Sequence, residues 1–161
     1  MAKTLAPTKG NLMMAKNTLR LSKQGYEMLD KKRNILIREM MLLIEEAKEV
    51  EAKIEETFAA AYKALESANV IMGVSKVQNL AHSAVLENSV KVDLRSVMGV
   101  EIPSIDYEEK KAATEYDFFT TPSSLDDAFL KFNEVKNLTI RLAEIENSVY
   151  RLASNIKKTQ K

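Results

Sequence analysis

The sequence is poor in the residues that build cross-links, metal sites and tight turns. It has no cysteine, which excludes disulfides, zinc ribbons and cysteine nucleophiles. Its single histidine, His82, rules out the paired Glu-x-x-His motifs of a di-iron bundle. Three prolines and four glycines are too few for an all-β sandwich or barrel. The glycines are also too far apart for a dinucleotide-binding loop or a P-loop, so no cofactor site is expected.

The sequence also lacks long apolar runs and a large excess of one charge. No stretch approaches the length of a membrane span, and the N-terminus lacks the apolar core of a signal peptide, so we expect a cytoplasmic protein without membrane insertion. The net charge of +1 gives no general attraction to nucleic acid. Lysine, glutamate, leucine and alanine are abundant instead, and 29% of the residues are charged. This composition is typical of long helices or a coiled coil.

Residues 9–70 are predicted to form one continuous helix. Thr8 is a suitable N-cap, and no proline follows until Pro103. With Leu12 as the first position of a heptad, the first and fourth positions are almost all apolar as far as Ile71. An unbroken repeat of 3.5 residues implies a left-handed supercoil with a partner helix. The clearly polar exceptions are Ser22, Arg33 and Thr57. Arg33 could reach out from the edge of the seam or fix the register.

A second long helix is predicted over residues 124–161. Pro122 precedes it, and Asp126 and Asp127 place negative charge in its first turn. We expect it to pair antiparallel with the first helix, with Phe129 and Phe132 near the small residues Ala64 and Ala61. Its heptad positions are Val135, Leu138, Leu142, Ile145, Val149, Leu152 and Ile156.

The two helices differ in length, and the apolar stripe of the first one widens along the chain. The stretch from Leu12 to Leu29 has no partner within the sequence, so we expect either a longer natural chain or another protein to cover it. With the exception of Glu51, the fifth heptad positions become apolar from residue 37 onward. Either the middle segment or another subunit should therefore pack on that side. These positions include Ile37, Ile44, Phe58, Leu65 and Met72.

The middle of the chain predicts a short helix over 74–87, a β-hairpin over 89–103 and a loop over 106–121. In the hairpin, Val90, Val92 and Leu94 alternate with polar residues and should face inward or toward a partner. Pro103 is expected to end the second strand. The fold class is therefore dominated by α-helix: one elongated domain over 1–161, a long antiparallel two-helix coiled coil with a small helix and a β-hairpin inserted between the long helices.

Charge is unevenly spread along the first helix. Residues 9–38 carry eight basic and two acidic side chains, whereas residues 39–66 carry eight acidic and three basic ones. These are either ordinary solvated faces or a basic tip that sits in an acidic cavity. Nucleic-acid binding is disfavoured because no aromatic residues interleave with the basic ones. The candidate contacts of the basic tip are Lys9, Lys16, Arg20 and Lys23.

Three motifs resemble the D subunit, the central-axis component of archaeal- and vacuolar-type rotary ATPases and ATP synthases. Pro7-Thr8-Lys9 followed by Leu12 opens the first helix, residues 25–38 resemble the family's Gly-x-x-x-Leu-x-x-Lys-Arg-x-x-Leu-x-Arg block, and Val97 to Pro103 (VMGVEIP) is similar to its hairpin motif. The family's last helix continues into a stretch rich in Arg, Ala and Asn, which is missing after Lys161. This departure indicates a truncated chain.

The resemblance implies a non-catalytic rotor shaft, peripheral on the membrane as part of the ATPase complex. It implies catalytic A and B subunits around the tip, and the F subunit and the membrane-ring adaptor at the base that carries the hairpin. The hairpin residues expected to contact partners are Val97, Met98, Gly99, Val100 and Pro103. No catalytic constellation or metal-ligand set is visible, and the acidic clusters near Glu45 and Glu55 are best explained as solvated helix faces. A static coiled-coil scaffold or tether is the alternative, although it would not need a hairpin.

Overall fold

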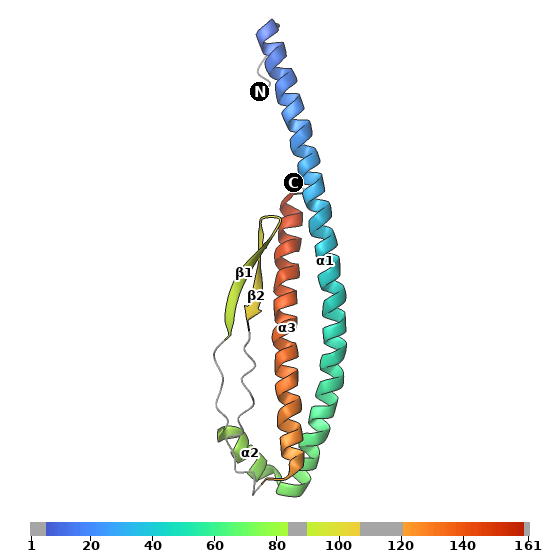
Figure 1. The fold of residues 1–161 in the computed structure, drawn as a ribbon, viewed down its shortest axis with the longest axis vertical. Coiled ribbons are helices and arrows are strands. Elements are labelled where there is room, and N and C mark those ends of the chain that lie inside the picture. The colour runs from blue at the N-terminus through green and yellow to red at the C-terminus, as the bar shows by residue number, and fades with distance from the viewer. Residues whose placement is uncertain (1–5, 84–89, 107–120, 160–161) are drawn as a thin grey trace.

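The chain forms a long rod in the computed structural model, which describes residues 6–83, 90–106 and 121–159 (Figure 1). Two long helices run antiparallel, and a two-stranded hairpin lies along one of them. The predicted fold class is confirmed. In chain order the elements are α1 (Lys9–Met72), α2 (Val74–Ser83), β1 (Lys91–Val97), β2 (Val100–Asp106) and α3 (Ser123–Thr159).

Helix α1 runs for 64 residues without a break. At 1.5 Å per residue it is roughly 96 Å long. The Thr8 hydroxyl oxygen accepts a hydrogen bond from the Asn11 N–H at 3.3 Å, as expected for an N-cap. Gly73, with a φ of 86°, ends the helix in a conformation that suits glycine.

The seam between α1 and α3 follows the predicted heptads from Leu36 onward. The apolar positions of α3 pack against those of α1, and Leu36, Ile145 and Leu152 are almost completely buried. Near the other end, the ring of Phe132 meets those of Phe58 and Tyr62 edge-on, with centroids 6.4 and 5.5 Å apart. The other buried apolar residues of the two helices are Leu43, Val50, Ala61, Ala68, Leu125, Ala128, Val135 and Ile156.

The N-terminal part of α1 extends beyond the end of α3 (Figure 1). Its seam positions Leu12, Leu19 and Tyr26 are each more than half exposed, so the predicted unpartnered stretch is present. At the boundary, Arg33 pairs with Asp30 of its own helix, with Nη2 and Oδ1 2.5 Å apart. This bond fits a side chain that reaches outward from the seam edge and does not fix the register of the two helices.

The hairpin is longer than predicted at its second strand. β2 continues through Pro103 to Asp106, so the expectation that Pro103 ends the strand is wrong. Val97 pairs with Val100 around a two-residue turn, and the alternation of the ladder makes Leu94 and Pro103 a non-hydrogen-bonded pair. The nitrogen of Pro103 therefore points to the free edge of the sheet, where a missing N–H costs no ladder bond.

Val90, Val92 and Leu94 do not face inward against the rest of this chain, so that part of the prediction for the hairpin is also wrong. Val92 and Leu94 are each 58% exposed, and Val90 is exposed as well. The residues buried against the helices are Val100 and Ile102 of β2. Residues opposite one another in a ladder share a face, so the tight turn places Val97, Val100 and Ile102 inward and turns Val92 and Leu94 outward.

Helix α2 folds back onto the end of α1. Val77 is buried and packs with Ala68 and Leu125, and the half-buried Leu65 and Met72 lie against the same cluster. The middle segment therefore covers part of the widened stripe of α1, although Ile44 remains 36% exposed and Ile71 faces outward. The predicted helical residues 84–87 and most of the predicted loop, residues 107–120, lie outside the described part of the chain.

Candidate partner-binding surfaces

The four basic residues proposed for the tip are all exposed on the free part of α1. Lys9, Lys16 and Lys23 are seven residues apart and line one flank, and Arg20 lies on the same part of the helix. This part of α1 extends past the end of α3 (Figure 1), so these charges are open to a partner from several sides.

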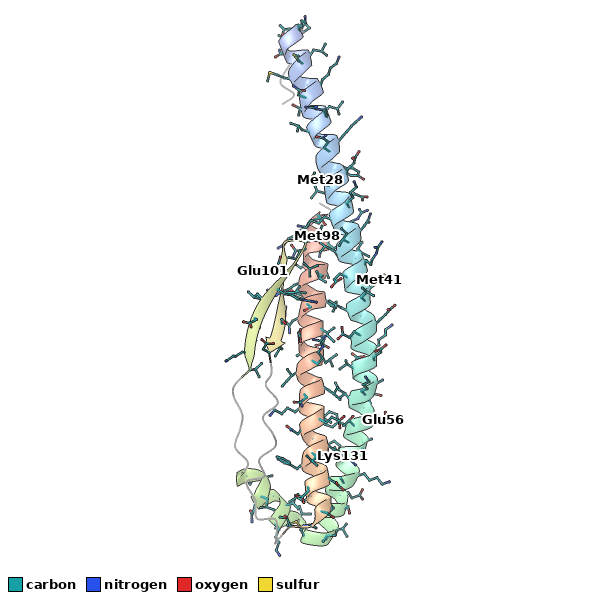
Figure 2. All side chains as sticks on the ribbon, in the orientation of Figure 1. Met28, Met41, Glu56, Met98, Glu101 and Lys131 are labelled. Carbon is teal, nitrogen blue, oxygen red and sulfur yellow. The ribbon has the colours of Figure 1, made fainter. Side chains whose placement is uncertain are left out.

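The five hairpin residues proposed as contacts are divided between the surface and the core. Met98 is 48% exposed and Gly99 is exposed, because these two residues form the turn. Both have positive φ, 50° and 78°, as a two-residue hairpin turn requires. Val100 and Pro103 are buried and Val97 is half-buried, so these three hold the hairpin in place and do not present themselves to a partner. Met98 is labelled on the hairpin in Figure 2.

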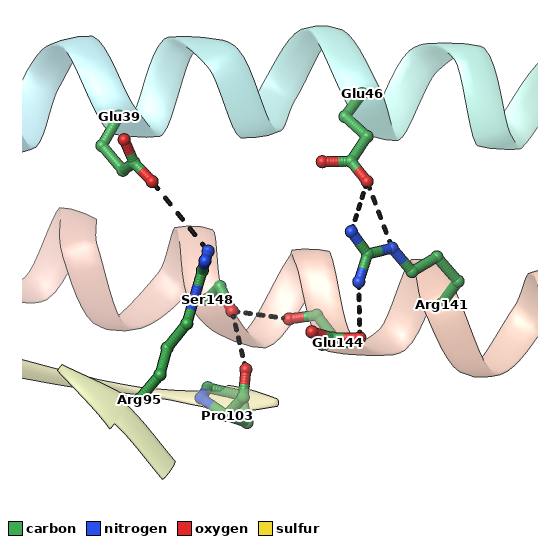
Figure 3. Close-up of polar contacts among 7 residues, drawn as sticks. All are labelled: Glu39, Glu46, Arg95, Pro103, Arg141, Glu144 and Ser148. Carbon is green, nitrogen blue, oxygen red and sulfur yellow. Dashed lines mark hydrogen bonds and ion pairs between the residues drawn. The ribbon is translucent and has the colours of Figure 1, made fainter. Parts of the chain in front are cut away.

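Polar contacts fasten the hairpin to both long helices. The Ser148 hydroxyl donates to the Glu144 carbonyl oxygen of its own helix at 2.8 Å and also lies 3.5 Å from the Pro103 carbonyl oxygen. The Arg151 guanidinium donates to the Glu101 carbonyl oxygen at 3.2 Å. Arg95 of β1 reaches across to Glu39 of α1, with Nη2 and Oε1 3.9 Å apart (Figure 3). Together with Val100 and Ile102, these contacts fix the position of the hairpin along the rod.

Arg141 of α3 joins the two long helices. Its Nη2 and Nε donate to Glu46 Oε1 of α1 at 2.6 and 3.1 Å, and its Nη1 donates to Glu144 at 2.9 Å (Figure 3). The hydrogen bond to Glu46 raises the pKa of the Arg141 guanidinium; burial opposes this and Glu144 adds to it. The guanidinium remains charged at physiological pH, so the bridge persists there.

A polar cavity of about 120 Å³ lies beneath the hairpin, lined by Leu43, Arg95, Ser104, Arg141, Glu144, Ile145 and Ser148. The two guanidinium groups around it are already paired with carboxylates. Both guanidinium groups are thus engaged within the protein, so we interpret this cluster as an anchor. Heptad reasoning missed it because the pairing of Arg141 with Glu46 depends on the register, which a repeating apolar pattern leaves open.

The described residues contain no group of three or more His, Cys, Asp or Glu placed to hold a metal ion. His82 is exposed near the end of α2. Among the described helices, none combines the length with the apolar character that crossing a bilayer requires.

An apolar surface marks the corner between α1 and α2. Val70, Ile71 and Val74 are each more than 60% exposed, and a shallow depression beside them is lined by Tyr62, Leu65, Glu66 and Asn69. This corner lies at the opposite end of the rod from the basic tip (Figure 1).

Comparison with known proteins agrees with this architecture. The family of the ATP synthase D subunit matches residues 11–161. The V-type ATP synthase D subunit of Thermotoga neapolitana is 42% identical over 158 residues, which cover 98% of this chain and 78% of the relative. The A-type ATP synthase D subunits of Pyrococcus horikoshii and Thermococcus kodakarensis are 32% and 34% identical, covering 98% and 96% of this chain and 75% and 74% of theirs. The chain therefore belongs to the ATP synthase D-subunit family and is a non-catalytic central-stalk component of a V-type or A-type rotary ATPase complex.

Proposed function

We propose that the basic tip of α1 turns inside a ring of catalytic A and B subunits and couples ATP hydrolysis or synthesis there to ion movement in the membrane. The observation that carries this proposal is the free part of α1, where Lys9, Lys16, Arg20 and Lys23 are exposed on a helix that extends past its partner. Attraction between such charges and an acidic lining varies smoothly with angle, so it restrains the rod without locking it.

The rod has the physical properties that coupling needs. α1 is one continuous helix, the seam with α3 stiffens it, and different side chains project from each flank. Each surrounding subunit then meets a different surface and favours a different conformation, which is coupling through differential contacts. A static scaffold would use the same seam, but it would not link rotation to catalysis.

The F subunit and the membrane-ring adaptor bind, in this proposal, the part of the rod that carries the hairpin and α2. Support comes from the exposed Val92, Leu94 and Met98 on the hairpin and from the apolar corner around Val70 and Val74. The chain then works at the cytoplasmic face of the membrane, as a peripheral part of the complex.

The tip is tested by changing Lys9, Lys16 and Lys23 together to Glu. Exposed single charges contribute little, roughly 0–1 kcal/mol each, so single changes to Ala should leave assembly nearly intact. The triple variant should bind the A–B ring more weakly and uncouple ATP hydrolysis from ion pumping. Ring binding and ion-coupled ATPase activity are measured across a salt series, since salt screens the attraction.

A matched control reverses three exposed lysines lower on α1, Lys48, Lys53 and Lys63, to Glu. This control changes the net charge by the same amount and should leave ring binding intact. If the tip variant assembles and pumps as well as the control at low salt, the basic flank only keeps the protein soluble.

The hairpin is tested in two ways. Replacing Val97 to Pro103 by a flexible Gly/Ser linker should weaken binding of the F subunit, but it also removes the buried Val100 and Ile102. The double change of Val92 and Leu94 to Ser alters only exposed side chains and leaves the core intact. Affinity for the F subunit and ATPase activity are measured in the reconstituted complex. Wild-type values for both variants would mean that the hairpin serves only packing.

A further inference from the structure

The turn of the hairpin holds a residue in a backbone conformation that is uncommon for its type. Met98 has a φ of 50°, and within residues 6–83, 90–106 and 121–159 it is the one non-glycine residue with positive φ. Left-handed backbone is unfavourable for most L-residues, because the Cβ atom comes too close to the backbone. Gly99, at a φ of 78°, meets the same requirement of the turn without a Cβ atom.

The chemistry of the turn favours a different residue at position 98. Two-residue hairpin turns of this kind most often carry Asn-Gly or Asp-Gly, since the short polar side chain tolerates left-handed backbone and bonds to the backbone nearby. A methionine side chain offers no such compensation. Met98 therefore makes the turn less stable than Asn would at the same position, and the turn itself does not explain why Met is there.

Packing inside the chain does not explain Met98 either. In the described part of the chain, Val97 packs against the buried cluster that contains Val100 and Ile102, whereas Met98 is not among the residues packed there. Met98 is 48% exposed and lies at the turn end of the hairpin (Figure 2). The buried neighbours on either side of the turn hold its conformation, while the strained residue itself remains open to a partner.

An apolar side chain that is kept at a strained and exposed position indicates a role in binding. The side chain of methionine is unbranched and polarizable, so it fits an irregular apolar pocket well. A few such buried anchors supply most of the affinity of a typical protein interface. Val92 and Leu94, each 58% exposed, extend the exposed apolar surface of the hairpin along β1 and would lie around such an anchor.

We propose that Met98 is the anchor of the hairpin and inserts into an apolar pocket of the subunit that binds there. The proposal rests on the proposed function, which assigns the hairpin to the F subunit. It adds which side chain carries the contact and why the turn departs from Asn-Gly. The left-handed backbone of Met98 lowers the stability of the hairpin, whereas its side chain raises the affinity for the partner. Replacing Met98 by the residue that the turn prefers should therefore change stability and affinity in opposite directions.

The test compares Met98→Asn with Met98→Leu in the full chain. Asn and Leu have similar shapes, but Asn suits the left-handed turn, whereas Leu keeps both the strain and the apolar surface. Met98→Asn should raise Tm by about 1–4 °C. It should also weaken binding of the purified F subunit at least about tenfold. Met98→Leu, the conservative variant, should leave Tm within about 1 °C and lose less than about threefold in affinity.

Thermal melts and isothermal titration with the F subunit give the two measurements on the same samples. If Met98 had only a structural role, the more stable Asn variant would bind at least as well as wild type. Wild-type affinity of Met98→Asn, or an equal loss for both variants, would overturn the inference while leaving the F subunit assigned to the hairpin. A Tm of Met98→Asn at or below that of wild type would overturn it too, because the turn would then not be strained by Met98. Failure of the wild-type chain to bind the F subunit would overturn both that assignment and this inference.

Discussion

Truncation of Leu152 to Ala should be one of the most damaging single changes to this rod. The Leu152 side chain is 0% exposed and belongs to the cluster that joins Leu36 of α1, Ile102 of β2 and α3 itself. Loss of its three outer carbon groups costs about 2.4 kcal/mol at about 0.8 kcal/mol per group. The cavity left among three elements that cannot all close on it adds to this, so we expect a total of about 3–4 kcal/mol.

This loss is measured by urea unfolding followed by far-ultraviolet circular dichroism, and by thermal melts, where it corresponds to a fall in Tm of about 6–16 °C. The control is Leu130→Ala on the same helix, because Leu130 is 58% exposed and its truncation should cost less than about 0.5 kcal/mol. The reasoning is refuted if the two variants unfold at the same urea concentration, since α3 would then not be seated as described.

Further predictions concern the ion pair between Arg141 and Glu46 and the two glycines Gly25 and Gly99. A double-mutant cycle of Arg141→Ala and Glu46→Ala should give a coupling below about 1 kcal/mol that shrinks in high salt, because both side chains are partly exposed; a larger, salt-insensitive coupling would contradict this. Gly25→Ala, in mid-helix with open space around it, should raise stability by about 0.5–1 kcal/mol. Gly99→Ala, at a φ of 78°, should lower it by about 1–2 kcal/mol. Thermal melts that move both glycine variants in the same direction would show that backbone conformation does not decide the sign.

The two long helices could be predicted from the sequence because their information is local and repeated. Every heptad of α1 and α3 repeats the same pattern of buried positions, so a single polar exception such as Thr57 does not change the prediction. The Thr57 hydroxyl donates to the Lys53 carbonyl oxygen within the helix. The unpartnered part of α1 followed from helix lengths alone.

The hairpin could be predicted as an element but not in its orientation. Both of its faces carry apolar residues, Val92 and Leu94 on one and Val100 and Ile102 on the other, so alternation alone does not say which face is inward. The choice follows from how β2 docks on α3 through side chains far apart in the sequence, among them Ser148. Local patterns carry no information about such contacts.

The position of the hairpin determines the rotational symmetry of the rod's cross-section. Two paired helices of similar width have a cross-section with an approximate twofold axis, so a surrounding surface meets nearly the same outline after half a turn. The hairpin lies along α3 on one side only, with β1 outermost (Figure 1). At the height of Val100 and Ile102 the twofold axis is lost, and the outline repeats only after a full turn. A partner at this height can distinguish orientations that the bare helix pair would leave ambiguous.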